Sequence, residues 1–154
     1  MEHIDKQLIG RTLIVLHKIA LGADHRGYET KEYIKGFADF VFFDYGTFSE
    51  DRTDYPIYAK AVCDAVLSGD VHGGILCCAS GAGMAIAANR NPGIYAAVAW
   101  NACVARQVRE DDWCNVLVIP TAFITIDDVA EILQGWATAT PKEGRYKDRL
   151  EQID

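Results

Sequence analysis

The chain has 154 residues, half of them apolar and about a quarter charged, and its net charge is −7 at neutral pH. This length and composition predict one globular domain that buries about 70% of its unfolded surface. The acidic balance excludes a nucleic-acid scaffold, because a phosphate backbone is bound by a basic protein face. It still allows a small anionic ligand held by a few local arginines.

Short apolar runs alternate with segments of helical spacing along the chain. We interpret residues 1–11 as an N-terminal extension and residues 12–154 as a single domain. In the helix predicted after the second strand, Asp54 is the expected N-cap and Pro56 lies in the first turn. The first half of the pattern predicts a strand at 17–22, a helix at 28–38, a strand at 40–46, a helix at 54–70 and a strand at 73–78.

The second half continues the alternation and ends in a polar segment. Strands that alternate with helices through short links are typical of a parallel sheet covered on both faces. The pattern therefore predicts an α/β fold, a doubly wound five-stranded parallel sheet with a C-terminal helix. The remaining elements are a helix at 83–90, a strand at 94–100, a helix at 101–112, a strand at 115–120, a helix at 126–137 and a last helix at 141–153.

The chain lacks the marks of a membrane protein or a secreted framework. Its longest apolar run near the start, residues 12–22, is too short to span a bilayer and precedes no cleavage site. An odd number of cysteines without C-x-x-C spacing argues against a disulfide framework and against a zinc site. We therefore expect a cytoplasmic protein with free thiols, no metal and no membrane partner. The five cysteines are Cys63, Cys77, Cys78, Cys103 and Cys114.

The most informative stretch is GGILCCASGAGMAIAANR, residues 73–90. In this fold class ligands bind at the carboxyl ends of strands, and Cys78 is predicted at such an end. The loop from Ser80 to Gly83 is nearly free of side chains, so its backbone amides can approach a ligand closely. The N-terminus of the following helix favours a thiolate, or an oxyanion formed beside it. Cys78 can thus act as a nucleophile or as a general base.

Simpler interpretations compete with this one. The loop lacks the third glycine of a dinucleotide fingerprint, and no Walker motif is present. From spacing alone, Cys78 is explained equally well as a functional thiol and as a small core hydrophobe. For the other four cysteines, spacing favours a core position. An Asp24-His25 pair at a strand tip is often a helix cap. Further predicted strand tips are Asp44 to Gly46 and Trp100-Asn101.

Four segments in register, GADHRGYETK, DYP, GILCCASGAGMAIAANRNPGIYAA and ARQVREDD, resemble the ribose-5-phosphate isomerase B family, which includes galactose-6-phosphate isomerase subunits. The similarity runs from about residue 18 to residue 150. It implies a Rossmann-like fold and a homodimer or dimer of dimers with shared active sites. It also implies an aldose–ketose isomerase without metal or cofactor, which acts on a small sugar phosphate through a cis-enediolate. Ribose 5-phosphate is the substrate we expect first.

The resemblance also assigns roles to individual residues. Cys78 matches the cysteine that moves a proton between C1 and C2, and Ser80 matches a residue that contacts the reacting oxygens. Backbone N–H groups of Gly81, Ala82 and Gly83 would hold the enediolate. The residues implied to bind the sugar or its phosphate end are Asp24, His25, Tyr55 and Asn101.

Arg145 and Arg149 lie four residues apart in the predicted last helix, so they share one face and repel each other. A solvated charged face explains the pair equally well by itself. The family has two arginines with this spacing that bind the substrate phosphate, commonly from the partner subunit. Paired guanidinium groups suit phosphate geometry. The resemblance therefore implies that both arginines bind phosphate across a dimer interface.

Three departures from the family pattern stand out. Many members have a ring-opening histidine at the position of Trp100, and a second branch has it at the position of Asp111. Many members also have a further phosphate-binding arginine after the last strand, where this chain reads IPTAFITIDD. These departures keep two alternatives open. One is an isomerase for a tetrose or hexose phosphate, and the other is a catalytically idle subunit that binds a sugar phosphate.

Overall fold

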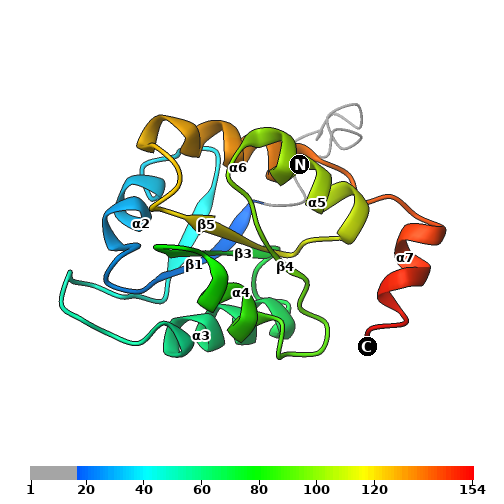
Figure 1. Cartoon of the computed structure of the whole chain (residues 1–154), viewed down its shortest axis with the longest axis horizontal. Coiled ribbons are helices and arrows are strands. Elements are labelled where there is room, and N and C mark those ends of the chain that lie inside the picture. The colour runs from blue at the N-terminus through cyan, green and yellow to red at the C-terminus, as the bar shows by residue number, and fades with distance from the viewer. Residues whose placement is uncertain (1–16) are drawn as a thin grey trace, which may run out of the picture.

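The computed structural model describes residues 17–154, so the predicted extension at residues 1–11 lies outside the described residues. Figure 1 shows a five-stranded sheet through the middle of the molecule, with all neighbouring strands parallel. The strand order is β2-β1-β3-β5-β4. The strands are β1 (Lys18–Ala23), β2 (Val41–Asp44), β3 (Gly73–Cys78), β4 (Ala96–Val98) and β5 (Val116–Pro120).

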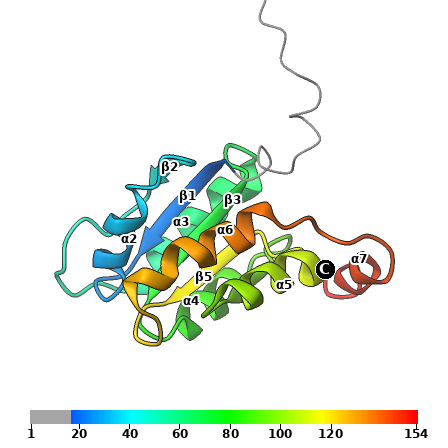
Figure 2. The same ribbon diagram turned by 90° about the horizontal axis from the view of Figure 1, so that it is seen from above.

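Helices cover both faces of this sheet, which confirms the predicted doubly wound, Rossmann-like α/β fold. Helices α3 and α4 lie on one face, and α2, α5 and α6 lie on the other (Figures 1 and 2). None of the helices in residues 17–154 has the length and apolar composition that a bilayer crossing requires. The helices are α2 (Tyr28–Ile34), α3 (Tyr55–Ser68), α4 (Ala82–Ala88), α5 (Ala102–Asp112), the 3-10 helix η2 (Ile126–Asp128), α6 (Val129–Thr138) and α7 (Arg145–Leu150).

The central strand β3 separates two hydrophobic cores. All six of its residues are buried, as expected for a strand covered on both faces. Successive side chains point to opposite faces, so Cys77 packs into the core that contains Trp136 of α6. Cys78 packs into the other core, with Val62 of α3 and Met84 of α4. The sheet therefore splits the thiol pair, and only Cys78 lies in the same layer as α4.

The remaining cysteines separate into buried and exposed positions. Cys63 and Cys114 are buried, as predicted, and burial raises the pKa of these thiols to about 11 and about 12. The prediction of a core position is wrong for Cys103, which is exposed on α5. Helix α5 buries Ala105 and Arg109, which are four residues apart on one face, and Cys103 lies on another face of the helix.

Several element ends differ from the predicted ones. Helix α2 ends at Ile34 instead of residue 38, because Gly36 follows closely and glycine costs about 1 kcal/mol inside a helix. Helix α7 begins at Arg145 instead of residue 141, since Gly144 before it has a φ of 70°. Asp54 takes the predicted N-cap position of α3, but its side chain makes no capping hydrogen bond.

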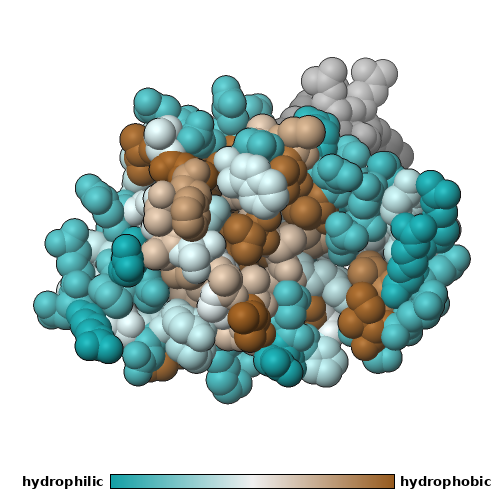
Figure 3. All heavy atoms as spheres, in the orientation of Figure 1, coloured by the Kyte–Doolittle hydropathy of each residue, from teal (hydrophilic) through white to brown (hydrophobic). Residues whose placement is uncertain are grey.

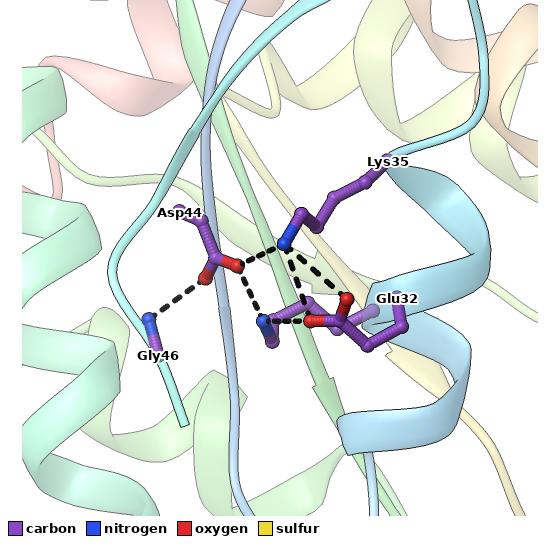
Figure 4. Close-up of polar contacts among 5 residues, drawn as sticks. Glu32, Lys35, Asp44 and Gly46 are labelled. Atoms are coloured by element: carbon purple, nitrogen blue, oxygen red, sulfur yellow. Dashed lines mark hydrogen bonds and ion pairs between the residues drawn. The ribbon is translucent and has the colours of Figure 1, made fainter. Parts of the chain in front are cut away.

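A buried lysine anchors the carboxyl end of β2 (Figure 4). Lys31 of α2 is fully buried, and its Nζ lies 2.6 Å from Asp44 Oδ2 and 2.7 Å from Glu32 Oε1. Lys35 Nζ lies 2.8 Å from the same Asp44 oxygen, and the Gly46 N–H donates to Asp44 Oδ1 at 2.9 Å. Burial by itself would raise the pKa of Asp44, but these hydrogen bonds outweigh it and hold the pKa below its ordinary value. The cluster ties α2 to the turn after β2.

Candidate active site

The carboxyl ends of the five parallel strands meet at one side of the sheet, which we call the carboxyl edge. After β1 the chain first adds β2 on one side and then returns to place β3 on the other. The direction of winding thus reverses between β1 and β3, and ligands bind at such a switch point in open α/β sheets. Asp24 follows β1 there and Cys78 ends β3, and the Asp24 N–H donates to the Cys77 carbonyl at 3.3 Å.

Cys78 has a buried sulfur that faces backbone amides. The residue is only 4% exposed, and its Sγ accepts a hydrogen bond from the Gly81 N–H at 3.2 Å. Burial raises the pKa of the thiol, and the Asp24 carboxylate adds to the rise, while the amides of Met84, Gly81 and Ser80 lower it. The pKa lies above its ordinary value. The amides therefore act in the predicted direction, but burial outweighs them in the free site.

The loop after Cys78 is tightly folded around Gly81. This glycine has a φ of 79°, and a Cβ there would lie 3.0 Å from Val98 and 3.3 Å from Val118. A side chain is thus excluded both by backbone conformation and by packing. Ser80 is exposed, and its Oγ accepts a hydrogen bond from the Ala82 N–H at 3.2 Å. The loop therefore presents a hydroxyl and backbone amides beside Cys78.

Tyr55, the first residue of α3, packs directly on this loop. A Cβ at Gly83 would lie 2.8 Å from the Tyr55 Cζ, so the glycine leaves the space that the ring occupies. The ring is about a third exposed, at 37%. The structure thus places Tyr55 against the loop, and its packing role accounts for part of its position.

Asp24 and His25 both bind backbone groups at the carboxyl edge. Asp24 is 8% exposed, and its Oδ1 accepts hydrogen bonds from the N–H groups of Arg26 at 2.9 Å and Gly27 at 3.1 Å. These bonds close the turn before α2, whose N-cap is Gly27 without a side-chain capping bond, so the helix-cap alternative is wrong for Asp24. His25 Nδ1 lies 3.2 Å from the Thr53 carbonyl oxygen and 3.3 Å from the Thr53 nitrogen. His25 therefore joins the tip of β1 to the loop before α3.

Asn101 and Trp100 reach the carboxyl edge after β4. Asn101 is the N-cap of α5, and its Oδ1 accepts a hydrogen bond from the Val104 N–H at 2.8 Å. Trp100 is 54% exposed. Strand β5 lies between β3 and β4, so these residues are about two strand spacings, roughly 10 Å, across the sheet from Cys78.

Arg145 and Arg149 are not at this edge in the same chain. Figure 2 shows α7 at the end of the molecule away from the carboxyl edge, next to the C-terminal end of α5. Both guanidinium groups flank the ring of Tyr146, with Cζ atoms 5.1 Å and 5.8 Å from its centroid. Neither arginine forms an ion pair within residues 17–154. The structure thus brings the two arginines together with each other but not with Cys78.

Asp111 also lies far from Cys78 within the chain. It sits in the last turn of α5, about 15 Å along the helix from Asn101. Lys142 Nζ lies 2.7 Å from its Oδ1, and this hydrogen bond holds the pKa of Asp111 below its ordinary value. The side chain is therefore an ionised, paired carboxylate at neutral pH.

Two residues beside these groups, Thr121 and Tyr146, were not predicted from the sequence. The Thr121 Oγ1 at the end of β5 lies 3.3 Å from the Cys78 carbonyl oxygen and 3.2 Å from that of Arg26. The signal for Thr121 was a hydroxyl directly after β5, the strand next to β3. The signal for Tyr146 was its position between two arginines in one helix. No group of three or more His, Cys, Asp or Glu side chains within residues 17–154 is arranged to hold a metal ion.

Comparison with known proteins bears out the resemblance seen in the motifs. The family model described as Ribose/Galactose Isomerase matches residues 19–153. Ribose-5-phosphate isomerase B of Escherichia coli (strain K12) is 38% identical over 141 residues, which cover 90% of this chain and 95% of that protein. A ribose 5-phosphate isomerase from Thermotoga maritima superimposes with a TM-score of 0.88 at 38% identity, covering 90% of this chain and 97% of that one. Ribose-5-phosphate isomerase B of Clostridium thermocellum gives 0.86 at 37% identity, covering 88% and 94%. The chain therefore belongs to the ribose/galactose isomerase family.

Proposed function

We propose that this protein interconverts ribose 5-phosphate and ribulose 5-phosphate. The observation that carries the proposal is the buried Cys78 Sγ at the switch point of the sheet, 3.2 Å from the Gly81 amide. The relatives named above are ribose 5-phosphate isomerases and cover nine-tenths of the chain. Family and geometry therefore support the same reaction.

The proposed reaction moves one proton between neighbouring carbons. The Cys78 thiolate takes the C2 proton of the open-chain aldose, which leaves a cis-enediolate, and the same sulfur returns the proton to C1. The hydroxyl proton of O2 passes to O1, so that C2 becomes the carbonyl carbon of the ketose. The Ser80 hydroxyl and the backbone amides of Gly81, Ala82 and Gly83 stabilise the charge that develops on O1 and O2. Burial raises the pKa of Cys78, so the thiolate forms in a small fraction but is a stronger base than an exposed one.

The phosphate end is proposed to bind arginines from a second copy of the chain. Arg145 and Arg149 are exposed and lie away from Cys78 in their own chain. Figure 3 shows apolar side chains in the middle of the face that carries β4 and α4, and hydrophilic ones along the outer side of α7. Ile86 of α4 is 59% exposed and Trp100 after β4 is 54% exposed. A homodimer, alone or within a dimer of dimers, would cover such a face and complete each site.

Incubation of the purified protein with ribose 5-phosphate in D2O tests the reaction. We expect ribulose 5-phosphate with deuterium at C1, because the Cys78 proton exchanges with solvent. The product and its label are measured by NMR, with Cys78→Ser as the background. Turnover no faster than in that variant would contradict the proposal, and turnover that never incorporates deuterium would contradict the enediolate.

A tetrose phosphate is a second candidate substrate, because neither Trp100 nor Asp111 supplies an imidazole for ring opening. Asp111 is held ionised by Lys142 and is a poor acid. A tetrose 4-phosphate needs no opening, since its O4 is esterified. A kcat/KM about a hundredfold higher for erythrose 4-phosphate than for ribose 5-phosphate would make the tetrose the substrate. Binding without turnover across tetrose, pentose and hexose phosphates would indicate an idle subunit.

A cytoplasmic location is part of the same proposal. The five cysteines are free, and Cys103 is exposed without a disulfide partner. Exposed free thiols suit a reducing compartment.

A further inference from the structure

Arg26 carries an unpaired positive charge at the carboxyl edge. Its side chain is exposed and forms no hydrogen bond or ion pair within residues 17–154. Many other cations on the surface of this acidic chain are paired with carboxylates. These are Lys35, Lys60, Arg106, Lys142 and Lys147.

The backbone of Arg26 is held on both sides. Its N–H donates to Asp24 Oδ1 at 2.9 Å, and its carbonyl oxygen accepts from Thr121 Oγ1 at 3.2 Å. The same Thr121 hydroxyl lies 3.3 Å from the Cys78 carbonyl oxygen. One hydroxyl group therefore bridges the backbones of Arg26 and Cys78. The position of Arg26 relative to the base is set, while its long side chain stays free to meet a ligand.

The segments that bind the backbone of Arg26 are the tip of β1 and the loop after β5, and they carry no other lysine or arginine. His25 precedes Arg26, and the loop after β5, residues 121–125, carries no basic side chain. The carboxylate of Asp24, two residues before Arg26, has one oxygen bound to the N–H groups of Arg26 and Gly27. The guanidinium thus has no ion-pair partner within residues 17–154.

We propose that Arg26 binds the phosphate group of the sugar phosphate from within the same chain as Cys78. A guanidinium suits phosphate because it offers paired N–H donors in a planar fork and stays charged at all working pH values. The inference deepens the proposed isomerase function and rests on it for the sugar. The phosphate contact itself can be tested without turnover.

Binding of inorganic phosphate to the full chain, measured by calorimetry at low ionic strength, tests the contact. We expect Arg26→Ala to weaken binding about tenfold or more, because a charge-assisted hydrogen bond is lost. Arg26→Lys should lose less. Arg90→Ala is the matched control, since Arg90 is an exposed, unpaired arginine just beyond the other end of α4. It should bind phosphate like the unchanged protein.

Kinetics add a test that a purely structural role would not pass. For ribose 5-phosphate, Arg26→Ala should raise KM about tenfold or more and leave kcat nearly unchanged. This result is expected when the lost contact is equally strong in the substrate complex and in the transition state.

The outcomes separate the two proposals. Equal phosphate affinity in Arg26→Ala and Arg90→Ala would overturn the role of Arg26, as would absence of phosphate binding to the unchanged protein at millimolar concentration. If the unchanged protein isomerises ribose 5-phosphate and Arg26→Ala keeps its KM, only the Arg26 inference fails. If the unchanged protein fails to isomerise but Arg26→Ala loses phosphate affinity, only the proposed function fails. Thermal unfolding of each variant confirms that it is folded.

Discussion

The carboxyl edge around Cys78 and the helix α7 differ in how far one chain completes them. At the carboxyl edge, Cys78 Sγ accepts a hydrogen bond from the amide-rich loop, and the ring of Tyr55 packs against the same loop within one chain. On α7, Arg145 and Arg149 share a face and the ring of Tyr146, and neither forms an ion pair within residues 17–154. Folding of one chain thus brings Cys78, the loop and Tyr55 together, but it leaves Arg145 and Arg149 at the far end of the molecule.

This difference follows from how each region is held. Cys78 is in the central strand, where every side chain is buried and backbone position is set by two neighbouring strands. Helix α7 has six residues and packs mainly against the end of α5. A central strand holds its side chains in precise positions, whereas a short terminal helix is available to contact a neighbouring molecule.

Cys78→Ser should remove most of the activity and Cys77→Ser should keep most of it. General-base catalysis contributes about 10²–10⁴-fold, and only Cys78 faces the loop amides. Cys77 lies in the opposite core, where burial raises the pKa of its thiol far above the ordinary value. The measurement is kcat on ribose 5-phosphate with thermal unfolding as a folding check. Equal loss in both variants would remove the distinction between the two sides of the sheet.

Asp44→Asn should destabilise the chain by about 3 kcal/mol, because it leaves the fully buried Lys31 without its closest carboxylate. The pKa of Asp44 is lowered in the folded chain, so its contribution to stability is present above the ordinary aspartate pKa. The contribution is lost as pH falls through the lowered folded value. Urea unfolding of both proteins at neutral and acid pH measures this, and the gap between them should shrink at acid pH.

Asp64→Asn is the control for this prediction. Asp64 pairs with Lys60 at 2.8 Å on the exposed surface of α3, where such a pair contributes about 0.5 kcal/mol or less. An equally small effect of Asp44→Asn would show that the carboxyl end of β2 does not depend on the buried cluster.

Arg149→Ala should mainly raise KM, by about tenfold or more, since a charge-assisted bond to phosphate contributes about 1.5–3 kcal/mol. If α7 serves a neighbour, mixing Arg149→Ala subunits with Cys78→Ser subunits recreates one unaltered site in each mixed dimer. Activity at low substrate concentration should then exceed that of either parent. Verified mixed dimers without regained activity would mean that each subunit uses its own arginines.

Trp100→His should change the preference between substrates by the smallest factor, a few-fold. An imidazole there can open the ring of ribose 5-phosphate but does nothing for erythrose 4-phosphate, so kcat/KM should rise for the pentose alone. The ratio of the two values is the measurement, with Trp100→Gln as the control for losing the indole. An unchanged ratio would show that ring opening does not limit the rate.

Much of the local order was predictable because it depends on neighbouring residues. The apolar runs placed all five strands, and the position of Cys78 before a side-chain-poor loop located the candidate base. Element ends were less predictable. Gly36 ends α2 early and Gly144 makes α7 start late, although the helical patterns extend beyond both glycines. The exposure of Cys103 depended on which face α5 turns to the sheet, and spacing among cysteines carries no information about that face.

Residue order alone accounts for the alternation of strands and helices, the family, and the set of side chains available at strand ends, so these were predictable. How those side chains combine depends on the tertiary structure. It placed the two adjacent cysteines in opposite cores, gave Cys78 a raised pKa through burial, and buried Lys31 against Asp44. It also set Arg26 beside Thr121 and left Arg145 and Arg149 at the far end. Burial and proximity between distant segments arise from packing, and packing is a property of the whole fold.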